Sequence, residues 1–388
     1  MTQLDQALAY LDQCREEILF LWETLVRMES PSADPEAIDR LASHLDTFCG
    51  ALGMDTAFFR PQGAGTCLSA RTRAGTGSPV LLLGHMDTVH PVGSFPGGPW
   101  RLEGGSVYGP GAHDCKGGLV IALYVIRALQ HAGYDRRQLR LALVSDEETA
   151  HTLSQGQTVD FLRREAQGCG AAFTFESGLP DGSVVTRRKG GGIVQLQVRG
   201  IASHAGTAPE QGASAVLEAA RKIVAIQALS DPAHTTFNCG LIRGGSSVNT
   251  IPAHCEVDIC IRFHSNQERD QALGKARAIC ERVETPGTHC TLGPLMGFPA
   301  MEETDRTAAL FALYRETSTA LGLGTPESVY SAGCSDSAYT TSMGIPTLCA
   351  VGVLGEGQHS PHEHALEESL LTQAKRLTAA ILSMPDDF

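Results

Sequence analysis

Hydrophobic residues recur along this chain with two spacings, one typical of helices and the other of buried strands. Residues 4–25 and 34–51 carry apolar side chains every three or four positions, which predicts two helical stretches near the N-terminus. Short apolar runs bounded by turn residues predict strands buried on both faces of a sheet, at 80–83, 139–145, 171–175 and 348–353. Helical stretches alternate with these runs, at about 116–131, 157–167, 304–321 and 367–384. The alternation predicts an α/β fold whose largely parallel central sheet is flanked by helices.

A different pattern begins near residue 187 and interrupts the first. Residues 193–199 alternate between apolar and polar side chains, as in a strand with one exposed face. A helix, two strands and a second helix are expected next, at about 212–229, 237–243, 254–263 and 267–284. We therefore expect a compact α+β module inserted into the α/β domain.

Composition and charge exclude several classes of protein. The chain has 388 residues, enough for two or three domains, and with 42% hydrophobic and 19% charged residues it is too apolar to be disordered. Its 30 Lys+Arg and 43 Asp+Glu give a formal net charge of −13 without a basic run. This balance argues against nucleic acid or an anionic membrane as the partner, and no apolar run reaches the ~18–20 residues of a membrane span.

The N-terminus and the cysteines indicate a cellular compartment. The first residues lack the basic and apolar regions of a secretory signal. The 12 cysteines are scattered singly, without a Cys-x-x-Cys pair. Such scattered cysteines are typical of free thiols in a reducing environment, so we expect a cytoplasmic protein.

Chemically reactive residues follow each predicted strand where it ends. They are His85 and Asp87, then Asp146-Glu147-Glu148, then Glu176, and finally His359. Ligands of open α/β sheets bind outside the carboxyl ends of the strands, so we expect these side chains to meet at one edge. Asp114, just before the helix at 116–131, is a further candidate.

Histidines and carboxylates without thiolates are the ligands of catalytic zinc, or of manganese or cobalt. Two histidines and three carboxylates are too many for one catalytic ion but suit two ions that share a bridging aspartate. Two divalent ions and three carboxylates leave one positive charge, which a hydroxide neutralises. Taken singly, each residue has an ordinary explanation, such as a helix N-cap for Asp114 or a solvated turn for Glu147-Glu148. Together at one sheet edge, they favour a metal site.

These residues and their order resemble the M20 family of dinuclear zinc peptidases and deacylases. The resemblance rests on His85-x-Asp87, Gly-Ala-His-Asp-Cys-Lys-Gly at 111–117, the Glu147-Glu148 pair, Glu176 and His359. Two segments of the inserted module, 203–215 and 244–252, are similar to the glutamate carboxypeptidase branch of that family. The resemblance covers essentially the whole chain.

The resemblance implies two Zn²⁺ per chain, or Co²⁺ or Mn²⁺, with Asp114 bridging them. His85 and Glu176 would complete one metal site, and Glu148 and His359 the other.

Two further residues would assist the chemistry. Asp87 would accept the other ring N–H of His85 and so set its tautomer. Glu147 would be the general acid and base. Because adjacent side chains of an extended segment point in opposite directions, Glu148 could bind metal while Glu147 stays free.

The resemblance also implies a lid and dimerisation domain over residues 187–296, inserted between the two parts of the catalytic domain at 1–186 and 297–388. His359 follows Glu176 by 183 residues, a gap too long for one strand–helix connection, which agrees with an insertion. The protein would be a homodimer through this domain. His204 would be a lid residue that polarises the scissile carbonyl, from its own chain or from the partner.

A second group of residues would bind substrate. Arg262, with Asn249, would hold the substrate carboxylate, a task suited to a guanidinium group. Gly333 begins a loop, Gly-Cys-Ser-Asp-Ser-Ala at 333–338, that departs from the Gly-Gly-Ser-Asp-Gly pattern frequent in the family. The bulkier side chains put glutamate preference in question.

We therefore predict metal-dependent hydrolysis of an amide bond that releases a C-terminal, acidic amino acid from a small peptide or an N-acyl conjugate. The alternative within the family is an N-acyl-amino-acid deacylase or desuccinylase with a different substrate. A serine hydrolase is disfavoured because no Gly-x-Ser-x-Gly follows a strand, and nucleotide chemistry because neither a P-loop nor Gly-x-Gly-x-x-Gly does. A metal-binding protein without catalytic activity would lack a free carboxylate such as Glu147.

Overall fold

The computed structural model describes residues 2–73, 75–386 and 388. The chain divides into two compact units. The larger unit comprises residues 1–187, 301–331 and 335–388, and the smaller unit comprises 188–300 and 332–334. Among the described residues, no helix combines the length and the apolar character that a bilayer crossing needs.

The larger unit is built on an eight-stranded sheet. Its strands lie in the order β1 (Asp55–Phe59), β2 (Cys67–Arg71), β6 (Arg137–Val144), β3 (Gly77–His85), β7 (Ala171–Thr174), β17 (Thr347–Cys349), β8 (Val184–Arg188) and β16 (Ser328–Ser331). The four central strands, β6, β3, β7 and β17, are parallel, whereas β1, β2 and β8 pair antiparallel to their neighbours. The predicted α/β fold with a largely parallel central sheet is confirmed.

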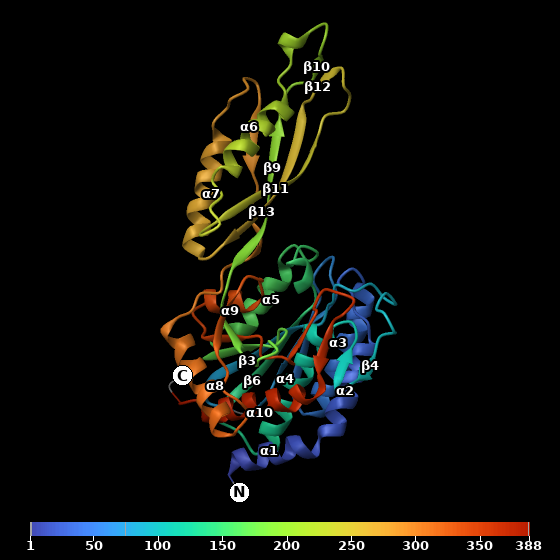
Figure 1. Ribbon diagram of the computed structural model, residues 1–388, viewed down its shortest axis with the longest axis vertical. Helices are drawn as coiled ribbons and strands as arrows, with labels where there is room; N and C mark the ends of the chain where they lie inside the picture. The colour runs from blue at the N-terminus through green and yellow to red at the C-terminus, as the bar shows by residue number, and fades with distance from the viewer. Residues whose placement is uncertain (1, 74, 387) are drawn as a thin grey trace. The chain divides into compact units, whose positions relative to one another are not determined.

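Helices cover both faces of this sheet (Figure 1). One face packs against α3 (Pro35–Ala51), α4 (Gly117–His131) and α8 (Asp305–Ala320), and α1 (Gln3–Gln13), α2 (Arg15–Arg27) and α10 (Glu367–Ser383) pack in turn on α4. The other packs against α5 (Gln157–Ala166) and α9 (Ser337–Ser342). In β3, Val80 and Leu82 belong to the core with α4 and α10, and the alternating Leu81 and Leu83 are equally buried. Burial on both faces explains the uninterrupted apolar run of this strand.

The first predicted helix is in fact two helices. The stripe over residues 4–25 is interrupted at Cys14, where α1 ends and α2 begins. Leu11, Ile18 and Trp22 are buried all the same, so the apolar stripe was identified correctly although the break was not.

A small second sheet of the larger unit carries a loop that matters below. It consists of β18 (Gly355–Glu356), β19 (His364–Leu366), β5 (Ser106–Tyr108) and β4 (Arg101–Glu103), in that order. Strands β18 and β19 pair antiparallel and hold between them the loop that contains His359. The pairing of β19 with β5 ties this loop to the segment that precedes Asp114.

The smaller unit is an antiparallel sheet with two helices on one face. Its strands are β11 (Thr236–Gly244), β13 (His254–Phe263), β9 (Gly190–Arg199) and β14 (His289–Leu292), with β15 (Met296–Phe298) also paired to β9. Helices α6 (Ala215–Gln227) and α7 (Asn266–Glu281) lie side by side against it (Figure 1). Residues of β13 alternate between buried and more exposed positions, because only one face is covered. The short strands β10 (Ser203–His204) and β12 (Thr250–Ile251) form a separate pair.

Candidate metal centre

Three ends of neighbouring parallel strands bring titratable residues to one edge of the larger sheet. His85 is the last residue of β3, Glu147 and Glu148 begin a 3₁₀ turn (η2, Glu147–Thr149) just after β6, and Glu176 follows β7. Gly118 allows helix α4 to begin at this edge, because a Cβ at that position would lie 2.2 Å from the carbonyl oxygen of Phe175. Asp114 immediately precedes this helix, in the turn η1 (Ala112–Lys116).

Asp114 stands between the two histidines. Its Oδ1 is 3.0 Å from His85 Nε2, and its Oδ2 is 3.4 Å from His359 Nε2. Each carboxylate oxygen therefore faces a different imidazole, which is the arrangement of an aspartate that bridges two cations. Burial alone would raise the pKa of Asp114, but hydrogen bonds to His359 and His85 hold it well below the usual value.

Two further carboxylates complete the two groups. Glu176 Oε2 is 3.9 Å from His85 Nε2, and Glu148 Oε2 is 2.9 Å from His359 Nε2. Two ligand atoms on one tetrahedral zinc ion, at about 2.0–2.2 Å from it, are roughly 3.4 Å apart. Asp114, Glu148 and His359 have donor atoms that all lie within 4.8 Å of one another, so these three residues could hold one ion. His85 and Asp114 form a second such group with Cys115, and Glu176 lies 3.9 Å from His85 beside it.

Cys115 is also near the first group, since its Sγ lies within ligand range of His85 and Asp114 donor atoms. However, this sulfur is 3.3 Å from both the backbone nitrogen and the carbonyl oxygen of His85. Burial raises the pKa of the Cys115 thiol to about 12, so the group stays protonated near neutral pH. A protonated thiol is a poor metal ligand, which leaves Glu176 as the better donor.

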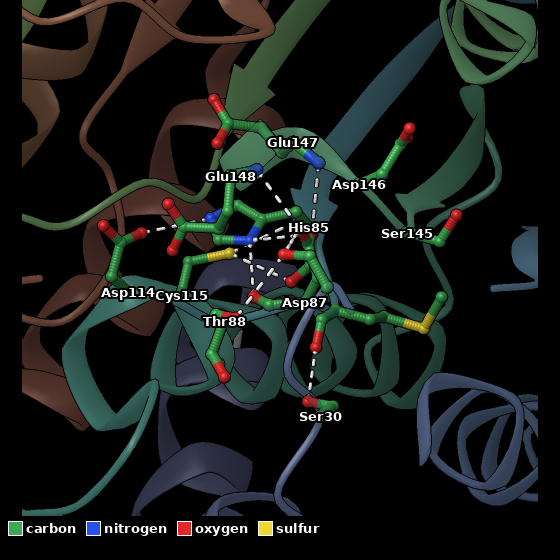
Figure 2. Close-up of polar contacts among 12 residues, drawn as sticks. Ser30, His85, Asp87, Thr88, Asp114, Cys115, Ser145, Asp146, Glu147 and Glu148 are labelled. Carbon is green, nitrogen blue, oxygen red and sulfur yellow. Dashed lines mark hydrogen bonds and ion pairs between the residues drawn. The ribbon is translucent and has the colours of Figure 1, made fainter. Parts of the chain in front are cut away.

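Asp87 contacts the ring of His85 chiefly through its backbone carbonyl. The ring Nδ1 of His85 donates to the backbone carbonyl of Asp87 at 2.9 Å, and the carboxylate is farther away, at 3.4 Å. The carboxylate instead accepts the backbone N–H groups of Glu147 and Glu148, at 3.2 and 3.1 Å, and the hydroxyl of Ser32 at 2.7 Å. Asp87 therefore orients His85 through its backbone and holds the Glu147-Glu148 turn through its side chain (Figure 2).

Glu147 and Glu148 adopt a different backbone conformation from the one we expected. The two residues belong to a 3₁₀ turn and not to an extended segment. In Figure 2 the side chain of Glu148 is directed toward Asp114, and the carboxylate of Glu147 lies above it. Burial, followed by the charge of Glu176, raises the pKa of Glu147 well above its usual value. Burial and the charge of Asp114 raise the pKa of Glu148 to about 7.

Glu363 is a buried residue of this site that the sequence did not reveal. Its Oε1 accepts the backbone N–H groups of His113 and Asp114, at 2.9 and 3.0 Å. Its Oε2 lies 2.8 Å from His90 Nε2 and 3.3 Å from the backbone nitrogen of Gly111. Glu363 thus holds the turn that carries Asp114, although only its position four residues after His359 could have drawn attention to it.

The residues expected to bind substrate lie in the smaller unit. The backbone N–H groups of Gly206 and Thr207 both donate to Nδ1 of His204, at 3.1 Å, so the neutral ring carries its proton on Nε2. The backbone carbonyl of Asn249 accepts the N–H of Ala205, which places Asn249 beside the His204 turn.

Arg262 belongs to another part of the smaller unit. It lies near the end of β13, and its Nη1 donates to Cys334 Sγ at 3.4 Å. The adjacent carbonyl of Gly333 accepts Nη1 of Arg188 at 3.2 Å. The structure thus brings Arg262 and Gly333 to one place, and Asn249 and His204 to another.

Comparison with known proteins finds similarity along most of the chain. Carboxypeptidase G2 of Pseudomonas sp. (strain RS-16) is 27% identical over 369 residues, which cover 93% of this chain and 87% of that protein. Succinyl-diaminopimelate desuccinylase of Corynebacterium glutamicum is 25% identical over 289 residues, or 72% of this chain and 74% of that one. The crystal structure of the M20 family metallo-carboxypeptidase Sso-CP2 from Sulfolobus solfataricus shares the fold, with a TM-score of 0.75 at 16% identity, covering 96% of this chain and 100% of that one.

Fold and site together define a metal-dependent hydrolase of amide bonds in peptides or acyl amino acids. The family model of Peptidase family M20/M25/M40 matches residues 81–383, and the chain belongs to this family. The resemblance inferred from the motifs is therefore confirmed at the level of the family.

Proposed function

We propose that this enzyme is a dinuclear metallocarboxypeptidase that releases a C-terminal, acidic amino acid from a peptidyl or N-acyl conjugate. The observation that carries the proposal is the position of Asp114 between His85 and His359, with a buried Glu147 close enough to Glu176 for its charge to raise the Glu147 pKa. The similarity to carboxypeptidase G2 along most of the chain supports the release of a C-terminal residue.

The proposed cofactor is two Zn²⁺ per chain, with Co²⁺ or Mn²⁺ as alternatives. Asp114, His85 and Glu176 would hold one ion, and Asp114, His359 and Glu148 the other. When bound, such ions polarise a carbonyl and lower the pKa of a water molecule to about 7. The two positive ions would also offset the repulsion among the three clustered carboxylates.

Glu147 would move the proton. One of its carboxylate oxygens would accept a proton from the attacking water and then deliver it to the leaving nitrogen. Two features of the structure suit this role. Asp87 accepts the backbone N–H of Glu147, which fixes the turn, and burial together with the charge of Glu176 raises the pKa of Glu147 well above its usual value, so that its carboxylate binds a proton more strongly.

Residues of the smaller unit would recognise the substrate. Arg262, with the backbone of Gly333 beside it, would bind the free α-carboxylate, and Asn249 would contact the substrate near His204. His204 would donate its Nε2–H to the carbonyl oxygen of the scissile amide. The hydrogen bonds that Nδ1 accepts support this assignment, because they leave Nε2 as the donor of the neutral ring.

A homodimer through the smaller unit is the proposed assembly. Strand β11 is the edge of the described sheet, and its Leu241 and Ile242 are more than half exposed, at 57% and 53%. On α6, which packs against β11, Leu217 and Val224 are also exposed. An unpaired edge strand beside exposed apolar side chains is suited to pairing with a second copy of the chain.

The second candidate function is an N-acyl-amino-acid deacylase with a substrate that is not acidic. The contact of Arg262 with Cys334 favours it, because that sulfur engages a guanidinium N–H that would otherwise be free for a carboxylate. The similarity to a desuccinylase is consistent with this alternative.

The deciding experiment is a hydrolysis screen of peptides and N-acyl amino acids, with and without a chelator. A carboxypeptidase should prefer C-terminal glutamate or aspartate, whereas the alternative enzyme should prefer neutral or basic amino acids. Hydrolysis that persists after complete removal of metal would contradict both. A cytoplasmic location is also proposed, and the free state of all 12 cysteines supports it.

A further inference from the structure

A buried histidine near the metal centre contacts two buried aspartates. Nδ1 of His151 lies 3.2 Å from Asp146 Oδ1, and its Nε2 lies 2.6 Å from Asp336 Oδ1. The exposed fractions of these three side chains are at most 2%. None of the three has a part in the function proposed above.

The hydrogen bonds of Thr158 determine how His151 is protonated. Thr158 Oγ1 donates its single hydrogen to Asp146 Oδ1 at 2.6 Å, and it lies 2.9 Å from His151 Nδ1. Because this hydroxyl has no second hydrogen, Nδ1 of His151 must be the donor in its contact with Thr158 Oγ1. The other ring nitrogen, Nε2, faces the carboxylate of Asp336. An imidazole that donates on both sides is an imidazolium ion, and its charge compensates for burying two carboxylates.

The two aspartates belong to two separate segments that both adjoin residues of the candidate metal centre. Asp146 directly precedes Glu147 and Glu148 in the chain. Asp336 follows Ser335, whose hydroxyl donates to Glu176 Oε1 at 3.2 Å. His151 thus connects the turn that carries Glu147 with the segment that contacts Glu176.

The backbone of His151 gives independent support for a role of its side chain. Both Ala150 and His151 adopt the left-handed conformation, with φ of 52° and 58°. This conformation disfavours residues that have a Cβ, and glycine would fit it better. The presence of histidine at such a position indicates that its side chain offsets the strain of the backbone.

We propose that His151 is a positioning residue that clamps the Asp146–Glu148 turn to the Ser335–Asp336 segment and thereby places Glu147 for proton transfer. The proposal rests on the proposed function of Glu147. It assigns to Asp336 the anchoring of the clamp, within the loop whose sequence departs from the family pattern.

The test is the variant His151→Gly, with Ala150→Gly as the matched control. Glycine relieves the backbone strain at either position, but only His151→Gly removes the clamp. We expect His151→Gly to keep its metal content while kcat falls about 10–100-fold and KM changes less, because a shift of about 1 Å in a catalytic group costs rate of this order. Added imidazole should restore part of kcat by occupying the vacated space, and Ala150→Gly should stay within about twofold of the parent.

Equal kcat per bound metal ion in His151→Gly and Ala150→Gly would overturn the proposal. A loss of activity in His151→Gly that is fully explained by its loss of metal would also overturn it. If His151→Gly does not fold, Asp336→Asn provides the same comparison, because the amide keeps the shape but weakens the contact with the imidazolium. We expect it to lower kcat with metal content unchanged, and an unaltered kcat would again overturn the proposal.

A readout independent of activity separates this proposal from the proposed function. Proton NMR of the parent should show downfield imidazole N–H resonances that are present in Ala150→Gly and absent in His151→Gly. Their absence from the parent would overturn the clamp. The parent could show these resonances and yet, with metal bound, hydrolyse no peptide or N-acyl amino acid. That result would contradict the proposed function but not the proposed clamp.

Discussion

The carboxylate of Glu363 accepts the backbone N–H of Asp114 at 3.0 Å and, through the same oxygen, that of His113 at 2.9 Å. Glu363 lies in the same loop as His359. Its buried side chain therefore connects this loop with the turn that carries Asp114, and both segments carry a proposed metal ligand. Because the backbone angles of Asp114 depart from those of a helix, this carboxylate supplies an acceptor for the N–H groups of His113 and Asp114.

Glu363→Gln should lower the affinity for metal about 10–100-fold, the usual cost of losing a partner that orients a ligand. The amide cannot accept the same set of hydrogen bonds, since one of its two polar atoms is a donor. Metal titration measured with a competing chelator checks the prediction. Glu356→Gln, a change to an exposed residue of the same hairpin, should leave the affinity unchanged, and equal effects of the two substitutions would assign no special role to Glu363.

The two neighbouring glutamates should respond differently to the same substitution. We expect about two Zn²⁺ per chain in the parent and in Glu147→Gln, with kcat of the variant lowered roughly 10²–10⁴-fold because the amide cannot take up a proton. Glu148→Gln should lose metal. Elemental analysis and steady-state kinetics of protein purified without chelator distinguish the two. A loss of metal in Glu147→Gln but not in Glu148→Gln would reverse the assignment, and activity that saturates at one ion would contradict the dinuclear site.

Much of this arrangement could be predicted from the sequence because it follows from the topology of the sheet. Parallel strands whose buried runs end in His85, Glu147-Glu148 and Glu176 must deliver these residues to one edge. His359 could not be selected in this way from among the histidines at 359, 362 and 364, because its position depends on the β18–β19 hairpin and not on the central sheet. Its selection came from the resemblance to the family.

The contacts that support the site could not be predicted from the sequence. Glu363 and Asp87 hold backbone N–H groups, which every residue possesses, so no pattern of side chains reveals the pairing. Asp336 meets His151 although the two residues are 185 positions apart in the chain. The expectation that Glu147 and Glu148 lie in an extended segment failed because the strand ends before them and a 3₁₀ turn begins.

Arg262→Ala should weaken the transition-state binding of substrates with a free α-carboxylate by about 2–5 kcal/mol, the cost of leaving one partner of a desolvated charge pair alone. Substrates with an amidated C-terminus should be poor for the parent and nearly unaffected by the change. The ratio of kcat/KM for each acid and its amide, in parent and variant, measures the effect. Equal losses on acid and amide would mean that Arg262 supports the local structure and does not bind the carboxylate.

His151 should make stability depend on pH in the alkaline range. Burial by itself would lower its pKa, but the charges of Asp336 and Asp146 outweigh it and raise the value to about 10. A histidine of the unfolded chain titrates near 6.5. Because the folded-state pKa is the higher one, the stabilisation is complete below about pH 6.5 and is lost as the pH rises toward 10. The difference in free energy of unfolding between the parent and His151→Gly, measured with denaturant, should therefore shrink over this range, and a constant difference would contradict a charged His151.

Mixed dimers can determine whether His204 acts on its own chain or on the partner. Removing one oxyanion donor costs roughly 10²–10³ in kcat, so His204→Ala should be nearly inactive, as should Glu147→Gln. In a mixed dimer of these two variants, a His204 that acts across the dimer would serve the chain that keeps its own Glu147, and one of the two sites would be intact. A His204 that acts within its own chain would leave both sites defective, because each chain lacks one of the two residues. Activity recovered after subunit exchange would therefore support a shared site, whereas none, with exchange verified by mass spectrometry of tagged chains, would confine His204 to its own chain.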